Sequence, residues 1–264
     1  MKWWFPLLNS PSPTRAPSDM SLPSARSIAF NRRVSLAWLK EGLRLRGEGL
    51  DGASWVEAMR SVVSAEVEGH DSIQKSLRYL RHALIEPGEI EPLREEAIQL
   101  FQTSRDPEKS RVLSWGLISA AYPFLEQVAG SIGRMLRIQP EMKLEQLLRR
   151  LADSFGEKET VRRSGRYSLG LIHDLGFVQR TKKAGTYAAS PVFRLEDAQL
   201  ASWMMKAWFV SSGTKGPVDR VALSNHPGLS FFDAPNLVAA ALKAGVLSVD
   251  RMSMSQDTVS LSHR

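Results

Sequence analysis

The spacing of apolar residues predicts helices over most of the chain before Tyr122. Apolar side chains recur there every three or four positions, as on one face of a helix. Five helices are expected, near residues 28–46, from 54, from 71, over 92–102 and over 107–121. Ser54 with Glu57 three residues later predicts a capping box, and Asp71 predicts an N-cap. This part of the sequence therefore predicts an all-helical N-terminal domain.

The pattern changes after Tyr122, where helical segments alternate with short segments of strand character. The expected elements are a helix over Pro123–Arg137, a short strand over Arg137–Gln139, helices over 144–155 and 160–175, and a hairpin over 177–188. Gly185 favours a tight reversal of the hairpin, because glycine adopts the positive φ angles that such turns need. A helix, a short strand, two helices and a hairpin, in this order, are typical of a winged helix-turn-helix.

The remaining sequence predicts a small α+β segment. A helix is expected over Glu196–Val210, and Asp233 is expected to cap another over 235–244. Alternating apolar residues over 246–249 and 258–261 predict a closing hairpin. The fold class is thus mainly α, with a proline- and serine-rich disordered tail at 1–25, a helical domain at 26–121, a winged-helix domain at 122–192 and C-terminal helices with a hairpin at 193–264.

The predicted helix over 160–175 has two chemically different sides. At about 100° per residue, one side collects apolar and small residues and is expected to pack. These are Val161, Gly165, Ser168, Ile172 and Leu175. The opposite side carries three arginines, a tyrosine and a histidine. Two glycines, Gly165 and Gly170, also lie in this helix, and each costs about 1 kcal/mol of helix stability relative to alanine. We expect a packing or close-approach reason for both glycines.

Positive charge is concentrated in this region. Ten Lys or Arg residues stand against five Asp or Glu between Lys143 and Lys183. Guanidinium groups suit both phosphate oxygens and the edge of guanine. We therefore expect duplex DNA to contact Arg149, Arg150, Arg162, Arg163, Arg166, Tyr167, His173, Arg180, Lys182 and Lys183. A solvated basic helix face is the alternative interpretation.

Composition supports a polyanionic partner without identifying it. The formal net charge is +7 and the sequence pI is about 9.8. The chain has no cysteine, which excludes disulfides, thiolate metal ligands and thiol nucleophiles and suits a reducing cytoplasm. No apolar run reaches the roughly 18 residues of a membrane span, so no membrane partner is expected.

Motifs for catalysis or cofactors are weak. Residues 47–52 match G-x-G-x-x-G, but they follow a predicted helix rather than a strand, and two carboxylates lie inside the motif. A flexible loop between helices is the better interpretation. The five histidines show no metal-ligand spacing, and His173 is expected at a phosphate or a base rather than as a general base. We expect no enzyme, no metal and no cofactor.

The order of these features resembles BrxA, a family of small helical proteins of BREX phage-defence systems. The corresponding residues are Trp55 and Ala58 in one helix, Gln74, Lys75, Ser76, Arg78, Arg81 and Leu84 in the next, the apolar segment Leu113–Arg137, and Arg166, Ile172 and Leu175 before the hairpin. The resemblance covers about residues 28–195 and rests on order and spacing. It implies a non-enzymatic DNA-binding component of a bacterial defence operon, working beside a methyltransferase, an alkaline-phosphatase-like protein and an ATPase.

Two other functions fit the same residues. A winged-helix transcriptional regulator would use the N-terminal helices for sensing or dimerisation. A scaffold subunit of a defence complex would use its wing to bind another protein and not DNA.

Overall fold

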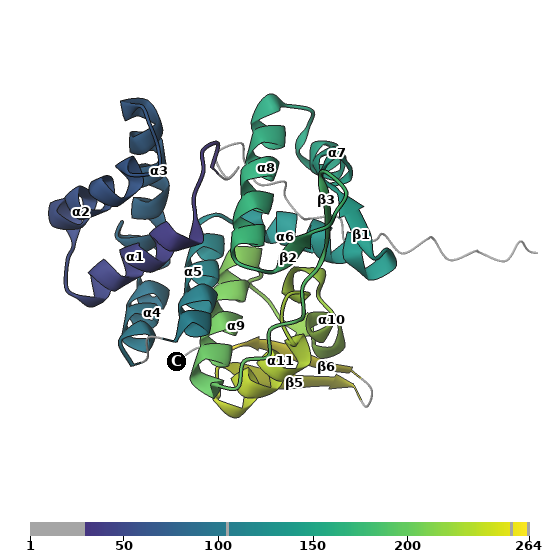
Figure 1. Ribbon diagram of the computed structural model, residues 1–264. Coiled ribbons are helices and arrows are strands. Elements are labelled where there is room, and N and C mark those ends of the chain that lie inside the picture. The colour runs from purple at the N-terminus through teal and green to yellow at the C-terminus, as the bar shows by residue number, and fades with distance from the viewer. Residues whose placement is uncertain (1–29, 104–105, 254–255, 263–264) are drawn as a thin grey trace, which may run out of the picture.

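The computed structural model describes residues 30–103, 106–253 and 256–262, so the predicted disordered tail at 1–25 lies outside the described residues. The chain is mainly helical and has two small antiparallel sheets (Figure 1). The helices are α1 (Leu36–Gly47), α2 (Gly52–Ser64), α3 (His70–Leu84), α4 (Glu91–Thr103), α5 (Pro107–Ala121), α6 (Phe124–Ile138), α7 (Leu144–Phe155), α8 (Glu159–Asp174), α9 (Ala198–Ser212), α10 (Arg220–Ser224) and α11 (Ala234–Lys243). The strands are β1 (Glu141–Lys143), β2 (Val178–Arg180), β3 (Thr186–Ala189), β4 (Val218–Asp219), β5 (Leu247–Ser253) and β6 (Gln256–Leu261).

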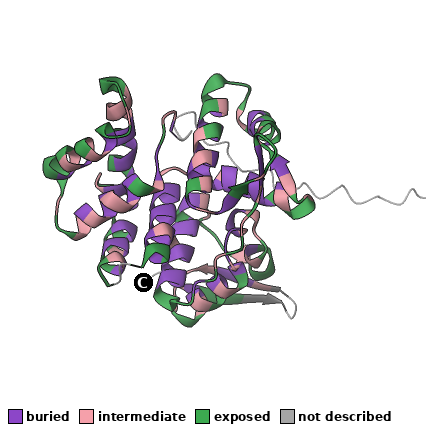
Figure 2. Cartoon of the chain, in the orientation of Figure 1, coloured by how far each residue is buried: buried purple, intermediate pink, exposed green. Residues whose placement is uncertain are grey.

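Helices α5 and α9 form the centre of the molecule, and Figure 2 shows both as largely buried. They approach closely at Gly116, where an added Cβ would lie 2.5 Å from ring atoms of Trp203. The Trp203 indole N–H donates to the carbonyl of Leu93 at 2.9 Å, so the buried ring has no unpaired donor. Helix α9 is thereby fixed against the N-terminal helices, and tryptophan serves here as core.

The N-terminal helices confirm the helical prediction, but the first helix is shorter than expected. Helix α1 begins at Leu36, because the Ser35 hydroxyl accepts from the N–H of Trp38 and caps it. The predicted start at residue 28 was therefore wrong. The preceding segment is held by side chains instead of helical hydrogen bonds. Phe30 packs against Tyr79 and Tyr122 with ring centroids 5.6 and 5.5 Å apart.

Two predicted helix caps were also wrong. Helix α2 begins at Gly52 and is capped by Asp51, whose carboxylate accepts from the N–H of Gly52 at 2.7 Å. The Ser54 hydroxyl donates to the carbonyl of Asp51 and is already inside the first turn. Helix α3 follows Gly69, which has a φ of 87°, and Asp71 lies in its first turn. The predicted loop at 47–52 is confirmed for residues 48–51, which join α1 to α2, whereas Gly47 ends α1 and Gly52 begins α2.

Residues 124–189, called here the first unit, contain α6, β1, α7, α8, β2 and β3 in this order. The strands pair antiparallel in the order β1-β3-β2, with Met142 and Arg180 both opposite Tyr187. The strand predicted at 137–139 was wrong, because α6 continues to Ile138 and the strand follows at β1. Gln139 is extended, as the residue before Pro140 must be, so the helix runs until the proline ends it.

Residues 198–261, called here the second unit, repeat this arrangement. Helix α9, β4, α10, α11, β5 and β6 follow one another, and the strand order is β4-β6-β5. The predicted hairpin is confirmed, with Val249 opposite Val259, and so is the Asp233 cap of α11. The two-residue strand β4 and the short helix α10 were not predicted. Each unit thus has one helix, a short strand, two helices and a hairpin, with the last strand in the middle of the sheet.

The two units meet where α6 packs against a 3-10 turn at Pro227–Leu229. Two glycines allow the contact. A Cβ on Gly133 would lie 2.1 Å from the carbonyl oxygen of Pro227, and one on Gly228 would lie 1.7 Å from Oε1 of Glu126. The backbones therefore touch where any larger side chain would separate the units.

Glu126 is a buried carboxyl group at this junction, with 4% of its surface exposed. Its Oε1 accepts from the indole N–H of Trp208 at 3.1 Å and lies 3.6 Å from Nδ1 of His226. Burial raises the pKa of Glu126 to about 8, against the opposing effect of the Trp208 hydrogen bond. Burial also lowers the pKa of His226, together with the charge of Arg134. Both groups are thus favoured in their neutral forms.

Candidate nucleic-acid interface

Helix α8 buries the side that its sequence pattern predicted. Val161, Ser168 and Ile172 are fully buried, and Gly165 lies against α7. A Cβ on Gly165 would lie 2.8 Å from methyl carbons of both Leu148 and Leu151. The expected packing reason is therefore confirmed for Gly165: the glycine lets α7 and α8 approach closely. Gly170 differs, because an added Cβ there would meet nothing within 4 Å.

The opposite side of α8 presents its arginines to solvent. Arg163 and Arg166 are exposed and share one carboxylate, with Glu159 Oε1 at 3.7 and 3.8 Å from their guanidinium nitrogens. These distances are too long for hydrogen bonds, so the donors stay available. Arg162 is half-buried and donates to Oε2 of Glu145 at 2.7 Å. Helix α8 thus offers two guanidinium groups that share one distant carboxylate and a third that is hydrogen-bonded to its own.

The turn between β2 and β3 adds three more cations. The N–H of Thr181 donates to the carbonyl of Thr186 at 3.0 Å and closes the turn, and Gly185 supplies a φ of 64°. The basic residues of this hairpin, Arg180, Lys182 and Lys183, are all exposed. Lys183 contacts Glu141 at 2.9 Å. Within the described residues, no carboxylate lies at ion-pair distance from the other two.

Helix α7 carries the two remaining arginines of the prediction. Arg149 and Arg150 are exposed, and Arg149 lies one helical turn after Glu145, the partner of Arg162. Arg149 therefore shares the side of α7 that approaches the start of α8. In the part of the chain that the structure describes, neither arginine has an ion-pair partner.

A small surface hollow, called here the arginine pocket, joins α8 to the hairpin. Its volume is about 260 Å³. Helix α8 contributes Arg166, Tyr167, Gly170 and His173 to its lining, and β2 contributes Arg180. The arginine-bearing side of α8 and the first strand of the hairpin therefore face the same space. Four of the ten predicted residues, Arg166, Tyr167, His173 and Arg180, are thus brought together at the pocket. The other six do not line it.

Sequence reasoning missed the remaining wall of this pocket. Arg33 and Val34, from the segment before α1, line it as well. The apolar pattern placed both residues inside a helix, so no sequence signal pointed to a neighbour 130 residues further along. Figure 1 shows this segment passing between α3 and α8.

Acidic side chains offset part of the local charge. Eight Lys and Arg residues among the predicted contacts face four carboxylates, those of Glu141, Glu145, Glu159 and Asp174. His173 lies 3.7 Å from Asp174 and contacts the ring of Tyr187 with centroids 6.2 Å apart. The surface thus keeps an excess of positive charge, as a polyanion site requires.

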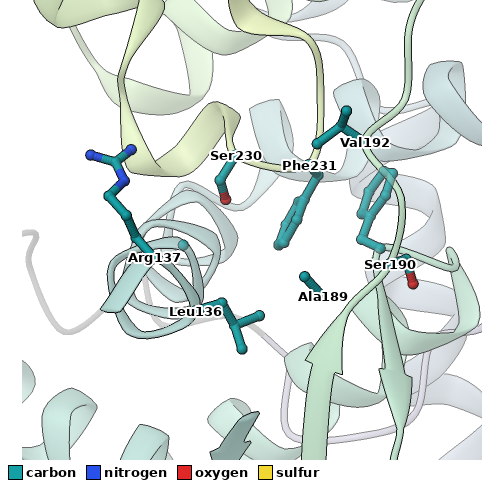
Figure 3. A pocket seen from close by; sticks show the side chains of 9 residues that line it. Leu136, Arg137, Ala189, Ser190, Val192, Ser230 and Phe231 are labelled. Carbon is teal, nitrogen blue, oxygen red and sulfur yellow. The ribbon is translucent and has the colours of Figure 1, made fainter. Parts of the chain in front are cut away.

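Two other hollows differ in chemistry. One, of about 230 Å³, lies between α6, the end of β3 and the 3-10 turn, and Figure 3 shows Leu136, Ala189, Val192 and Phe231 around it. The other, of about 490 Å³, lies between α4, α9 and the turn after α11. It is bordered by the ion pair of Lys206 and Glu96 at 2.9 Å. Neither gathers positive charge.

The described residues contain no group of three or more His, Asp or Glu side chains that could hold a metal ion. Among them, no helix has the length and apolar character needed to cross a bilayer.

Comparisons with known proteins return no relative. No family model, no curated protein and no solved structure matches the chain significantly.

Proposed function

We propose that the first unit is a winged helix that binds duplex DNA as a non-enzymatic module, with α8 as its recognition helix and the β2–β3 turn as its wing. One observation carries the proposal: Arg166 of α8 and Arg180 of the hairpin line the same pocket. A duplex binder needs its cations on one face, and two adjacent elements here supply them to one face. The element order and the β1-β3-β2 sheet support the same assignment.

The exposed side of α8 suits the major groove. In helix-turn-helix modules, the N-terminal residues of the second helix contact base edges. Arg163 and Arg166 lie in the first half of α8 and keep hydrogen-bond donors available for guanine or phosphate. Lys182 and Lys183 on the turn would contact the flanking phosphates, which fixes the register of the protein on the duplex.

The setting of bacterial antiphage defence rests on the resemblance to BrxA and on no structural observation. A partner subunit of a defence complex is part of the same proposal.

The test compares two double substitutions that remove the same charge. Arg163→Gln with Arg166→Gln removes two exposed cations of α8, and Arg194→Gln with Arg220→Gln removes two exposed cations elsewhere. Binding of a fluorescent 20-base-pair duplex is measured by anisotropy at about 50 mM salt. We expect the first variant to lose DNA binding and the second to keep it.

Equal affinity in both variants would contradict the assignment of α8. A discrete operator bound by a stable dimer would instead favour a transcriptional regulator. Tight binding to another protein, without any binding to DNA, would favour the scaffold.

A further inference from the structure

We infer that the arginine pocket is a phosphate site shared by the first unit and the N-terminal helices, with Arg33 as its third guanidinium. The inference rests on the proposed DNA binding and adds a contact from outside the winged helix. The ligand is a phosphodiester group of the duplex backbone.

The pocket combines groups that recognise phosphate. Arg33, Arg166 and Arg180 come from three separate parts of the fold, and Tyr167 and His173 add further hydrogen-bonding groups. Asp174 is the single carboxylate of the lining. Two of the three guanidiniums also have a carboxylate outside the lining, with Glu66 at 3.3 Å from Arg33 and Glu159 at 3.8 Å from Arg166. The lining itself holds three guanidiniums and one carboxylate, and this excess of positive charge favours an anion.

The position of Arg33 is set by the core. The carbonyl of Arg33 accepts from the hydroxyl of Ser76 in α3 at 3.1 Å, and the adjacent Val34 is buried. The guanidinium lies 3.3 Å from Glu66 and 5.6 Å from the ring centre of Trp38. These contacts hold the guanidinium in place, and because a guanidinium has five N–H donors, a phosphate in the pocket would share it with Glu66.

Gly170 gives independent support. Glycine inside a helix costs about 1 kcal/mol relative to alanine, and such a residue normally permits a close contact. Here an added Cβ would meet no atom within 4 Å, and the vacant side opens into the pocket. Packing thus does not require a glycine at this position, and the helix backbone there is open to close approach of a ligand.

The pocket is smaller than the sites that enclose drug-sized ligands. Its volume of about 260 Å³ is below the range of roughly 300–1,000 Å³ in which proteins enclose small ligands. A phosphate on the surface of a duplex needs no enclosure. The pocket would then extend the DNA track from α8 toward the N-terminal helices.

The experiment uses the full chain and adjacent residues as matched controls. Arg33→Gln removes a pocket guanidinium, whereas Arg32→Gln removes the same charge from a side chain that does not line the pocket. Duplex affinity is measured over a range of salt concentrations. Arg33→Gln is expected to weaken binding by roughly tenfold and to reduce the salt slope by about 0.9, the value of one phosphate contact. Arg32→Gln should leave the slope unchanged.

A second variant separates binding from folding. Gly170→Ala is expected to leave the melting temperature equal or higher, because alanine favours the helix and meets no neighbour. It should still weaken duplex binding, since its methyl group occupies the pocket. Inorganic phosphate at millimolar concentration is added as a competitor. If it binds to wild type as tightly as the duplex does, the site serves a free ion and the inference is overturned.

Failure of the inference and failure of the proposed function give different results. If Arg33→Gln and Gly170→Ala bind DNA like wild type while the α8 double variant does not, the pocket inference fails and the proposed function stands. If wild type itself does not bind duplex DNA, both fail.

Discussion

The two units of this chain have the same topology and different surface charge. Each follows helix, strand, helix, helix and hairpin, with strand orders β1-β3-β2 and β4-β6-β5. The helix directly before the hairpin differs between the units. In the first unit this helix, α8, carries three arginines, whereas the basic residue of α11 in the second unit is Lys243 alone. Topology therefore does not assign the function of either unit, whereas surface chemistry distinguishes them.

Core packing explains why the difference is confined to the surface. Both units contribute to one hydrophobic core, with Val161 and Ile172 of α8 and Leu237 and Val238 of α11 fully or almost fully buried. Burial fixes which side of each helix packs. The opposite side is free to vary, and in the first unit it is basic.

The largest expected effect concerns the junction of the two units. Glu126→Gln should raise the free energy of unfolding at pH 8 by at most about 5 kcal/mol, because the buried carboxyl no longer has to remain protonated. The folded pKa of about 8 lies above the unfolded value of 4.5. Wild-type stability from this group is therefore fully present below pH 4.5 and is lost as pH rises toward 8.

Urea unfolding of both proteins at pH 5, 6.5 and 8 measures this difference. His226 contributes with the opposite sign, since its lowered pKa favours folding as pH rises toward 6.5. Because Nδ1 of His226 lies 3.6 Å from Oε1 of Glu126, the comparison reports on the two groups together. A difference between the two proteins that stays constant with pH would contradict a neutral Glu126.

The next effect tests whether only the first unit binds DNA. Lys182→Glu with Lys183→Glu should weaken duplex binding by about a hundredfold, because two phosphate contacts become repulsive. Lys215→Glu with Lys243→Glu makes the same charge change at exposed positions of the second unit. Fluorescence anisotropy should show little change for this second variant. Equal losses would mean that net charge, not the first unit, determines affinity.

A smaller effect separates the two glycines of α8. Gly165→Ala should destabilise the fold by about 1–3 kcal/mol, because its Cβ would overlap Leu148 and Leu151. Gly170→Ala has no such overlap and is the matched control. Thermal unfolding followed by circular dichroism would show a lower melting temperature for Gly165→Ala alone. Equal melting temperatures would contradict the close packing of α7 on α8.

The smallest effect concerns the ion pair at the start of α8. Glu145→Gln releases Arg162 from its carboxylate partner and should strengthen duplex binding about threefold. Weaker binding would show that Glu145 is needed to orient Arg162. The same anisotropy assay measures the change.

Local sequence signals predicted much of the fold and part of the site. The bounds of α5 and α7 were predicted correctly, because Pro107 and the apolar period mark them. Helix α8 was predicted within one residue at each end, together with its buried side. These features depend on residues close in sequence, where periodicity and capping are informative.

Contacts distant in sequence were not predictable. Arg33 reaches the arginine pocket because Ser76 and the Phe30 aromatic cluster hold its segment away from helical geometry. Strand β4 has two residues and pairs with β6 some 40 residues later, so neither periodicity nor turn chemistry marked it. Tertiary packing determines both the position of Arg33 and the formation of β4.

The central claim is that the basic face of the first unit binds a polyanion, and the salt dependence of duplex binding by the wild-type chain tests it most directly. The logarithm of the binding constant should fall linearly with the logarithm of salt concentration, with a slope of about −0.9 for each phosphate that this face neutralises. A slope near zero, or no binding at about 50 mM salt, would contradict the claim.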